Sequence, residues 1–148
     1  MMKKNRFRFI AAVHLVLIKR NKILLSRRFN TGWRDGMYGV VSGHVESGER
    51  ATDAMVREAE EEAGMHINPK DLEFLHLTHR IDNGYERVDF FFKASKWRGT
   101  PKNMEPNRCD DMQWFSVDAM PDNTVPYVRD AIDDIRNKKI YSEFGWQA

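Results

Sequence analysis

The stretch GHVESGERATDAMVREAEEEAGM, residues 43–65, determines how the rest of this chain is interpreted. Residues 49–63 contain no proline or glycine and are rich in alanine, glutamate, arginine and methionine, which favour an α-helix. Gly64 follows, and glycine is the residue type that most often ends a helix. The sequence therefore predicts a helix over residues 49–63. Its last turns carry four glutamates, Glu58, Glu60, Glu61 and Glu62.

Three of these glutamates share one side of the predicted helix. At about 100° per residue, Glu58, Glu61 and Glu62 fall in one arc, whereas Glu60 falls in the ordinary solvated arc. Carboxylates at this spacing repel one another, and the C-terminal end of the helix dipole disfavours negative charge. A bound Mg²⁺ or Mn²⁺ reverses both effects, because hard divalent cations take oxygen ligands and leave room for substrate phosphates. An exposed acidic surface is the alternative, but the pattern favours half of a metal site.

The spacing of the charged and glycine residues resembles the Nudix box, G-x5-E-x7-R-E-U-x-E-E-x-G-U, where U is a bulky aliphatic residue. Every fixed position is matched, by Gly43, Glu49, Arg57, Glu58, Glu61, Glu62 and Gly64. Two departures are mild. Ala59 is small for a U position, and VVSGH stands where many members have a proline and a second glycine. The motif identifies the chain as a member of the Nudix hydrolase family.

This resemblance implies an α/β fold, an α/β/α sandwich around a mixed β-sheet, with the box forming a loop, a helix and a loop. It also implies Mg²⁺ or Mn²⁺ as the cofactor. The implied metal ligands are the carbonyl of Gly43 and the carboxylates of Glu58, Glu61 and Glu62. Arg57 is implied to hold the glutamates in position as part of the catalytic set, with structural support of the box from Glu49, Gly48 and Gly64.

Three positions outside the box resemble MutT-like members of the family. The segment WRGTPKNME, residues 97–105, nominates Glu105 as a fourth acidic metal ligand or as the general base, with an ordinary loop glutamate as the alternative. The segment ILLSRRF, residues 23–29, nominates Arg28 for contact with a substrate phosphate, with an exposed strand arginine as the alternative. Asn123 is nominated for recognition of a base, and a helix cap is the alternative.

The implied activity is hydrolysis of a diphosphate linkage, in which cations and a polarised water stabilise the charge that grows on phosphoryl and leaving oxygens. The favoured substrate is a nucleoside triphosphate, cleaved to the monophosphate and pyrophosphate. ADP-ribose, nucleotide sugars and dinucleotides are alternatives, although relatives with such specificities carry a proline or tyrosine where this chain has Ile81. A regulatory Nudix module that binds nucleotides without turnover is a further alternative, but such modules often lose box glutamates.

The rest of the chain is patterned as strands on both sides of the predicted helix. Residues 9–18 are apolar in both alternation classes, which predicts a central strand covered on both faces, and residues 23–29 are expected to pair with it through a turn at KRNK. Residues 71–81 and 87–97 predict a second hairpin, with its turn at DNG.

The C-terminal third predicts a short strand and a closing helix. MQWFSV, residues 112–117, is the strand, and residues 123–140 form an amphipathic helix with Pro126 near its start. A chain of 148 residues with 41% apolar content suits one hydrophobic core. We therefore expect a single Nudix domain over residues 1–148.

Composition limits the partners of this domain. Lys and Arg number 24 against 22 Asp and Glu, so no duplex nucleic acid is expected as a partner. The resemblance to the Nudix family implies a small nucleotide as the partner instead. No segment approaches the roughly 18 apolar residues that span a membrane. Cys109 is the only cysteine, which excludes an internal disulfide and indicates a reducing, cytoplasmic setting. A monomer and a homodimer are both compatible with the sequence.

Two further groups of residues are assigned to the scaffold. The five histidines do not form a metal-ligand spacing, so each is assigned to the core or the surface. Trp33 and Tyr38 precede the box and have the ring faces needed to stack on a base, but anchoring in the core is the favoured interpretation.

Overall fold

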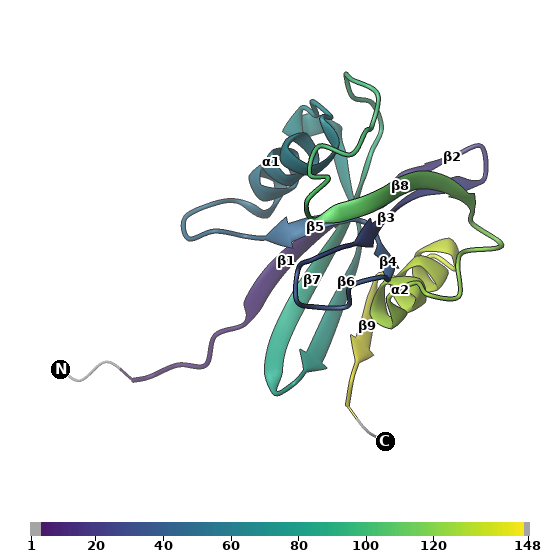
Figure 1. The fold of residues 1–148 in the computed structure, drawn as a ribbon. Coiled ribbons are helices and arrows are strands. Elements are labelled where there is room, and N and C mark those ends of the chain that lie inside the picture. The colour runs from purple at the N-terminus through teal and green to yellow at the C-terminus, as the bar shows by residue number, and fades with distance from the viewer. Residues whose placement is uncertain (1–3, 147–148) are drawn as a thin grey trace.

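The computed structural model describes residues 4–146, which form two β-sheets and two α-helices (Figure 1). The first sheet has the strand order β5-β1-β7-β6-β9. Its strands are β5 (Val41–His44), β1 (Ile10–Leu15), β7 (Tyr85–Ala94), β6 (Leu72–Asp82) and β9 (Tyr141–Phe144). The second sheet contains β2 (Ile18–Lys19), β3 (Lys22–Arg28), β4 (Tyr38–Gly39) and β8 (Cys109–Ser116). The helices are α1 (Ala51–Ala63) and α2 (Pro126–Arg136), and a 3₁₀ turn spans Pro69–Asp71.

The five-stranded sheet is mixed. β1 runs parallel to β7 and β6 runs parallel to β9, whereas the β1–β5 and β6–β7 pairs are antiparallel. β1 is a central strand, as its apolar residues in both alternation classes predict. The hairpin of β6 and β7 turns at Asn83 and Gly84, which both have positive φ, as the DNG sequence predicts. The α/β class is confirmed.

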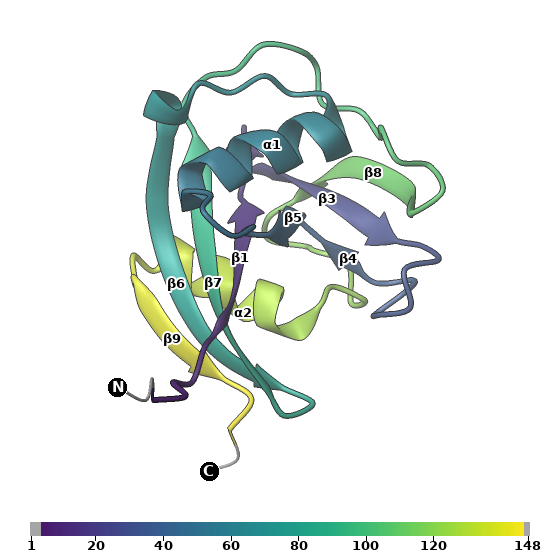
Figure 2. The same ribbon diagram turned by 90° about the vertical axis from the view of Figure 1, so that its left-hand side faces the viewer.

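The two helices cover opposite faces of this sheet (Figure 2). Val13 and Leu15 of β1 pack in one buried cluster with Met55 of α1. On the other face, Val16 and Phe91 pack in a second cluster with residues of α2. Strand alternation places Ala12 and His14 on the sheet face that α2 covers. His14 is described further with the pocket below.

Five features differ from the sequence predictions. The N-terminal hairpin joins β3 to β2, with Arg20 and Asn21 at positive φ in its turn, and β1 pairs with β5 and β7 instead. β9 is not among the predicted strands. α1 begins two residues later than predicted, after Arg50 as N-cap, and β8 begins at Cys109 rather than at Met112.

The C-terminal helix is shorter than the predicted residues 123–140. α2 begins at Pro126, after Val125 as N-cap, and ends at Arg136. Lys138 has positive φ, which is incompatible with a continuing helix.

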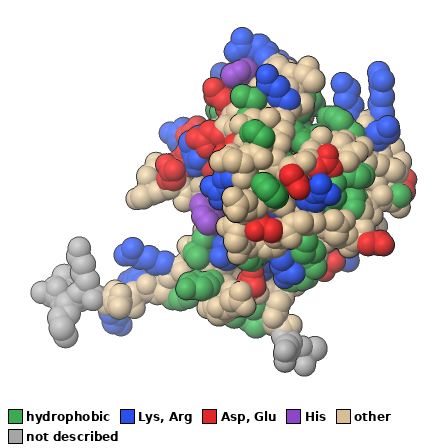
Figure 3. All heavy atoms as spheres, in the orientation of Figure 1, with side chains coloured by type: hydrophobic (Ala, Val, Ile, Leu, Met, Phe, Trp, Pro, Cys, Tyr) green, Lys and Arg blue, Asp and Glu red, His purple; other side chains and the backbone are tan. Residues whose placement is uncertain are grey.

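Two observations concern the surroundings of the chain: the character of its helices and the distribution of its charged side chains. No helix within residues 4–146 is long and apolar enough to cross a membrane. Figure 3 shows acidic and basic side chains interspersed on the face in view.

Candidate functional site

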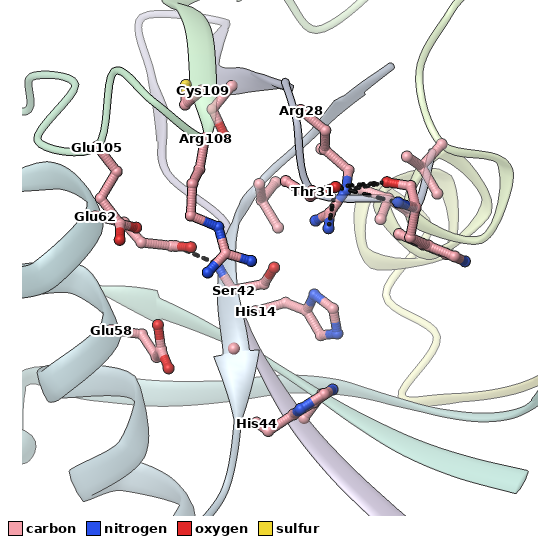
Figure 4. A pocket seen from close by; sticks show the side chains of 18 of the residues that line it. His14, Arg28, Thr31, Ser42, His44, Glu58, Glu62, Glu105, Arg108 and Cys109 are labelled. Carbon is pink, nitrogen blue, oxygen red and sulfur yellow. Dashed lines mark hydrogen bonds between the residues drawn. The ribbon is translucent and has the colours of Figure 1, made fainter. Parts of the chain in front are cut away.

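A pocket of about 680 Å³ is lined by residues from both sheets and both helices. This volume lies within the range of sites for nucleotide-sized ligands. Figure 4 shows Glu58, Glu62 and Glu105 on one side of the pocket and His14 and Arg28 on the other. The structure thus brings together residues from the Nudix box, from the 97–109 segment and from β3. The proposed site residues that line it are Arg28, Gly43, Arg57, Glu58, Glu61, Glu62 and Glu105.

Gly43 allows the carboxylate of Glu58 to approach the backbone of β5. A Cβ atom at Gly43 would lie 2.1 Å from Cδ and 2.1 Å from Oε1 of Glu58, distances that real Cβ contacts do not reach. Its φ is not in the left-handed region, so the glycine is required by space and not by backbone conformation. The contact places the Gly43 backbone and the Glu58 carboxylate at one point of the pocket wall.

Glu62 is held close to the same strand. Its Oε2 accepts a hydrogen bond from the backbone N–H of Ser42 at 2.9 Å. Burial, with smaller contributions from the negative charges of Glu58 and Glu105, raises the pKa of Glu62 to about 8 despite the Ser42 hydrogen bond. Burial also raises the pKa of Glu58, despite its contact with Arg57. The protein by itself therefore leaves the negative charge of this cluster poorly compensated.

Arg57 links the start of the box to its end. Its guanidinium donates to Glu49 at 2.9 Å, to Glu58 at 2.8 Å and to the backbone carbonyl of His44 at 3.0 Å. Hydrogen bonds from Arg57 and from the backbone N–H of Glu46 lower the pKa of Glu49 to about 2. Arg57 and Glu49 therefore fix the loop before α1 against the helix.

Glu61 lines the pocket but does not converge with the other glutamates. Its side chain is 55% exposed, and its Oε2 lies 3.4 Å from Nη1 of Arg57. Within residues 4–146, no three Asp, Glu, His or Cys side chains are arranged as a complete metal site. Mutual repulsion of the carboxylates and the pull of Arg57 account for this spread. The metal-ligand roles of these residues stay predictions.

The segment that carries Glu105 is attached to the C-terminal end of α1. The backbone N–H groups of Lys102 and Met104 donate to the carbonyls of Ala63 and Glu62 at 3.0 and 3.1 Å. These carbonyls belong to the last turn, which has no further helical donors. Gly99 approaches so closely that a Cβ there would lie 2.7 Å from the carbonyl oxygen of Gly64. This helix-end contact, at Gly99, Lys102 and Met104, delivers Glu105 to the pocket.

Arg28 lies at the end of β3 with its guanidinium partly buried. It donates to the carbonyl of Trp33 at 2.7 Å and to the hydroxyl of Thr31 at 3.1 Å, and it stacks over the Trp33 ring at 4.8 Å. Burial lowers the pKa of Arg28. Both hydrogen-bond acceptors are neutral, and among the described residues no carboxylate forms an ion pair with Arg28. Its charge is therefore available to an anionic ligand.

Asn123 is not brought to this pocket. Its side-chain N–H donates to the backbone carbonyl of Gly36 at 2.8 Å, and its backbone carbonyl accepts from the backbone N–H of Tyr38. The capping alternative is wrong, because the N-cap of α2 is Val125, whereas the role of Asn123 in base recognition stays a prediction. Asn123 therefore ties the segment before α2 to the loop after β3, and the pocket-lining set lacks it.

Several pocket residues were not found from the sequence. Arg108 and Arg87 line the pocket, and Arg108 extends toward its centre in Figure 4. Ser42 contributes a backbone group, which no side-chain pattern could have revealed. His14 also lines the pocket, although it had been assigned to the scaffold with the other histidines.

Trp33 and Tyr38 differ in their relation to the pocket. Tyr38 is buried in the core, as predicted, whereas Trp33 packs against that core and also lines the pocket. Cys109 lines the pocket too, but burial raises the pKa of its thiol, which makes it a poor nucleophile.

Comparison with known proteins agrees with this geometry. The NUDIX domain family model matches residues 8–135. The crystal structure of a MutT NUDIX hydrolase from Burkholderia pseudomallei is similar, with a TM-score of 0.78 and 26% identity, over 86% of this chain and 98% of that one. The MutT protein from Methanosarcina mazei shares the fold, with a TM-score of 0.73 and 19% identity, over 92% of this chain and 100% of that one.

Curated relatives are longer proteins. The chain is 29% identical over 114 residues to the NAD-capped RNA hydrolase NudC of Vibrio parahaemolyticus, which covers 77% of this chain and 41% of that protein. It is 30% identical over 115 residues to NudC of Pseudomonas putida, which covers 72% of this chain and 37% of that protein. The chain thus spans less than half the length of these relatives. Because the family model matches most of its residues, the chain belongs to the Nudix hydrolase family.

Proposed function

We propose that this protein is a divalent-metal-dependent pyrophosphohydrolase that cleaves the diphosphate linkage of a nucleoside diphosphate joined to another group. The observation that carries this proposal is that Glu58, Glu62 and Glu105 line the same pocket as the partly buried guanidinium of Arg28. A diphosphate substrate needs both cations and anion-binding groups around its phosphates.

The carboxylates of the pocket fit a divalent cation. Family members generally use Mg²⁺ or Mn²⁺, and such cations take oxygen ligands. The poor charge compensation of Glu62, together with the close approach of Glu58 to Gly43, is the chemistry that a cation would complete. The residues proposed to hold it are Gly43, Glu58, Glu61, Glu62 and Glu105. When bound, the cation supplies charge stabilisation for the phosphates and a water of lowered pKa.

The remaining steps belong to the chain's own side chains. Arg57 orients Glu58 and keeps the loop before α1 in place. Glu105, delivered by the helix-end contact, is proposed to accept a proton from the attacking water or to complete the cation site. Arg28 is proposed to pair with a phosphate oxygen from the opposite side of the pocket, since its guanidinium has only neutral partners.

The proposed substrate is a nucleoside triphosphate, hydrolysed to the monophosphate and pyrophosphate. The similarity to MutT NUDIX hydrolase of Burkholderia pseudomallei, which extends over nearly all of that chain, supports this choice. A dinucleotide linked through a diphosphate, as in a nicotinamide dinucleotide or an RNA cap built from it, is the second candidate. The similarity to the NudC relatives, which are NAD-capped RNA hydrolases, supports this second candidate. We further propose one Nudix domain over residues 1–148, active as a monomer or homodimer.

The test is a comparison of substrates with matched variants. The purified protein is incubated with Mg²⁺ or Mn²⁺ and with nucleoside triphosphates, ADP-ribose and NAD, and release of pyrophosphate and orthophosphate is measured. We expect pyrophosphate release from a triphosphate. Glu61→Gln should lose at least tenfold in kcat, whereas Glu60→Gln, altered at an exposed neighbour, should not. Equal rates for the wild type and Glu61→Gln would refute the proposed activity.

A further inference from the structure

His14 lines the pocket and carries a buried ring nitrogen without a hydrogen-bond partner among the described residues. The residue is 2% exposed, yet it belongs to the pocket lining, and in Figure 4 its ring lies across from the glutamates. No described protein group forms a hydrogen bond with its Nδ1. Buried polar atoms in folded proteins almost always have a partner. This nitrogen is therefore suited to a partner that comes from a ligand.

The other ring nitrogen fixes what Nδ1 can do. Nε2 lies 3.0 Å from Oδ1 of Asp89, a fully buried carboxylate. Burial raises the pKa of Asp89, but the hydrogen bonds from His14 and Arg80 and the charge of Arg80 outweigh it and hold that pKa below its ordinary value. The ionised carboxylate has no proton to donate, so Nε2 must be the donor. In the neutral imidazole Nδ1 is then a hydrogen-bond acceptor.

The orientation of this acceptor is held by packing as well. The ring of His14 is stacked on Phe91, with centroids 4.5 Å apart, and meets Tyr127 edge to face at 5.7 Å. Asp89 is fixed in turn by Arg80, whose Nε donates to it at 2.9 Å and whose guanidinium lies over Tyr127 at 3.8 Å. A ring flip would replace Nε2 by a carbon atom and lose the hydrogen bond to Asp89.

The position of His14 relates it to the proposed chemistry. In the register of β1 and β5, His14 is the direct partner of Ser42, whose N–H binds Glu62. Partners across antiparallel strands have Cα atoms about 4.5 to 5.5 Å apart. The acceptor is thus one strand away from the carboxylates that would meet the diphosphate. A ligand group that reaches it would belong to the part of the substrate that the diphosphate carries.

We propose that His14 is a specificity-determining residue, whose Nδ1 accepts a hydrogen bond from an O–H or N–H donor on the nucleoside part of the substrate. This inference rests on the proposed nucleotide substrate. Asp89 acts as a positioning residue, because it sets the tautomer. A site built around a fixed acceptor discriminates strongly against analogues that lack the donor.

The kinetic test compares His14→Phe with the wild type on four nucleotides. Phenylalanine keeps a flat ring against Phe91 but has no ring nitrogen. The probes are ATP, 2′-deoxy-ATP, 3′-deoxy-ATP and the triphosphate of purine riboside, which lacks the 6-amino group. For wild type, one analogue should lose at least tenfold in kcat/KM. His14→Phe should lose the same factor on ATP and nothing more on that analogue.

The pattern of losses identifies the donor. Loss with a deoxy analogue assigns it to a sugar hydroxyl, and loss with the purine riboside analogue assigns it to the base. Equal losses on all four nucleotides, or none, would overturn the inference. His79→Phe is the matched control, because His79 also has a buried nitrogen without a hydrogen-bond partner but is absent from the pocket lining. It should leave all four rates unchanged.

A spectroscopic readout separates this inference from the proposed activity. Long-range ¹H–¹⁵N spectra of the histidine rings should show the Nε2–H tautomer for His14 and a shift of its Nδ1 resonance when ADP is added. Asp89→Asn should disturb the tautomer and the discrimination together. If the wild type hydrolyses no nucleotide, the proposed function fails. If the Nδ1 resonance also ignores ADP, or the Nδ1–H tautomer is found, the inference fails as well.

Discussion

The two sides of the pocket differ in how far the protein compensates the charge of their buried carboxylates. On the α1 side, burial raises the pKa of both Glu58 and Glu62, and Arg57, the backbone N–H of Ser42 and the more distant charge of Arg28 offset their charge only in part. On the sheet side, Asp89 is more deeply buried, yet its pKa is held at about 2 because Arg80 and His14 donate to it directly.

This difference separates two functions within one pocket. An ionised group that is already paired with hydrogen-bond donors of the protein is held in place before a ligand arrives. Such groups are therefore suited to recognition. Charge that is left uncompensated is suited to chemistry, because it is completed by a cation and its phosphates. The following predictions disturb one side at a time.

The largest expected effect comes from filling the contact between Gly43 and Glu58. Gly43→Ala would place a Cβ 2.1 Å from the Glu58 carboxylate and displace it from β5. We expect kcat to fall by about 100-fold or more, which corresponds to ~2.7 kcal/mol. Gly39→Ala is the steric control, because a Cβ there meets nothing within 4 Å. Steady-state kinetics and thermal unfolding of both variants measure the effect, and a fully active Gly43→Ala would contradict it.

The second prediction concerns acid stability on the sheet side. The folded pKa of Asp89, about 2, lies below the ordinary value of 3.8 for an aspartate. Its ionised form therefore stabilises the fold above about pH 4, and this contribution is lost as the pH falls from about 4 to about 2. The loss should be on the order of 2 kcal/mol. Urea unfolding at several pH values measures it, and ¹³C titration of the carboxyl assigns it. A midpoint near 4 for Asp89 would show that the compensation is absent.

The two sides also differ in how far the sequence predicts them. The α1 side comes from a contiguous stretch whose helix, αL stop at Gly64 and glutamate spacing are local features. On the sheet side, Asp89 sets the tautomer of His14 across 75 positions of chain. The two residues meet only because β1 runs parallel to β7, a pairing that no local pattern encodes. His14 was therefore assigned to the scaffold.

The same physical limit explains the errors in the fold. Residues 9–18 predict a strand, but its end bends off as β2 and pairs with β3 in the other sheet. The choice between partners depends on which strand β1 reaches in space. β9 has four residues, none fully buried, and follows a helix directly, so it lacks the apolar alternation that marks a strand. Hairpin β6–β7 was predicted because its turn is local.

The third prediction returns to the α1 side. Glu105→Gln should lower kcat by about tenfold or more, which is ~1.4 kcal/mol of transition-state stabilisation. The change keeps the side-chain volume, and the helix-end contact that delivers the residue uses backbone groups, so the fold should be unaffected. Glu60→Gln, on the exposed face of α1, is the charge-matched control. An unchanged kcat for Glu105→Gln would show that Glu105 is an ordinary loop glutamate.

The smallest expected effect is at Arg28, which lies across the pocket from the glutamates. Arg28→Lys keeps a positive charge but loses the planar fork and its hydrogen bond to the Trp33 carbonyl. Because Arg28 is proposed to hold a phosphate in ground and transition states alike, KM should rise about threefold to fivefold with little change in kcat, which is roughly 0.7 to 1 kcal/mol. Arg34→Lys is the control, since Arg34 also lies over the Trp33 ring, at 5.8 Å, but is absent from the pocket lining. A fall in kcat without a rise in KM would instead move Arg28 into the charge-developing part of the reaction. A residue of β3, and not only the residues near α1, would then take part in the chemical step.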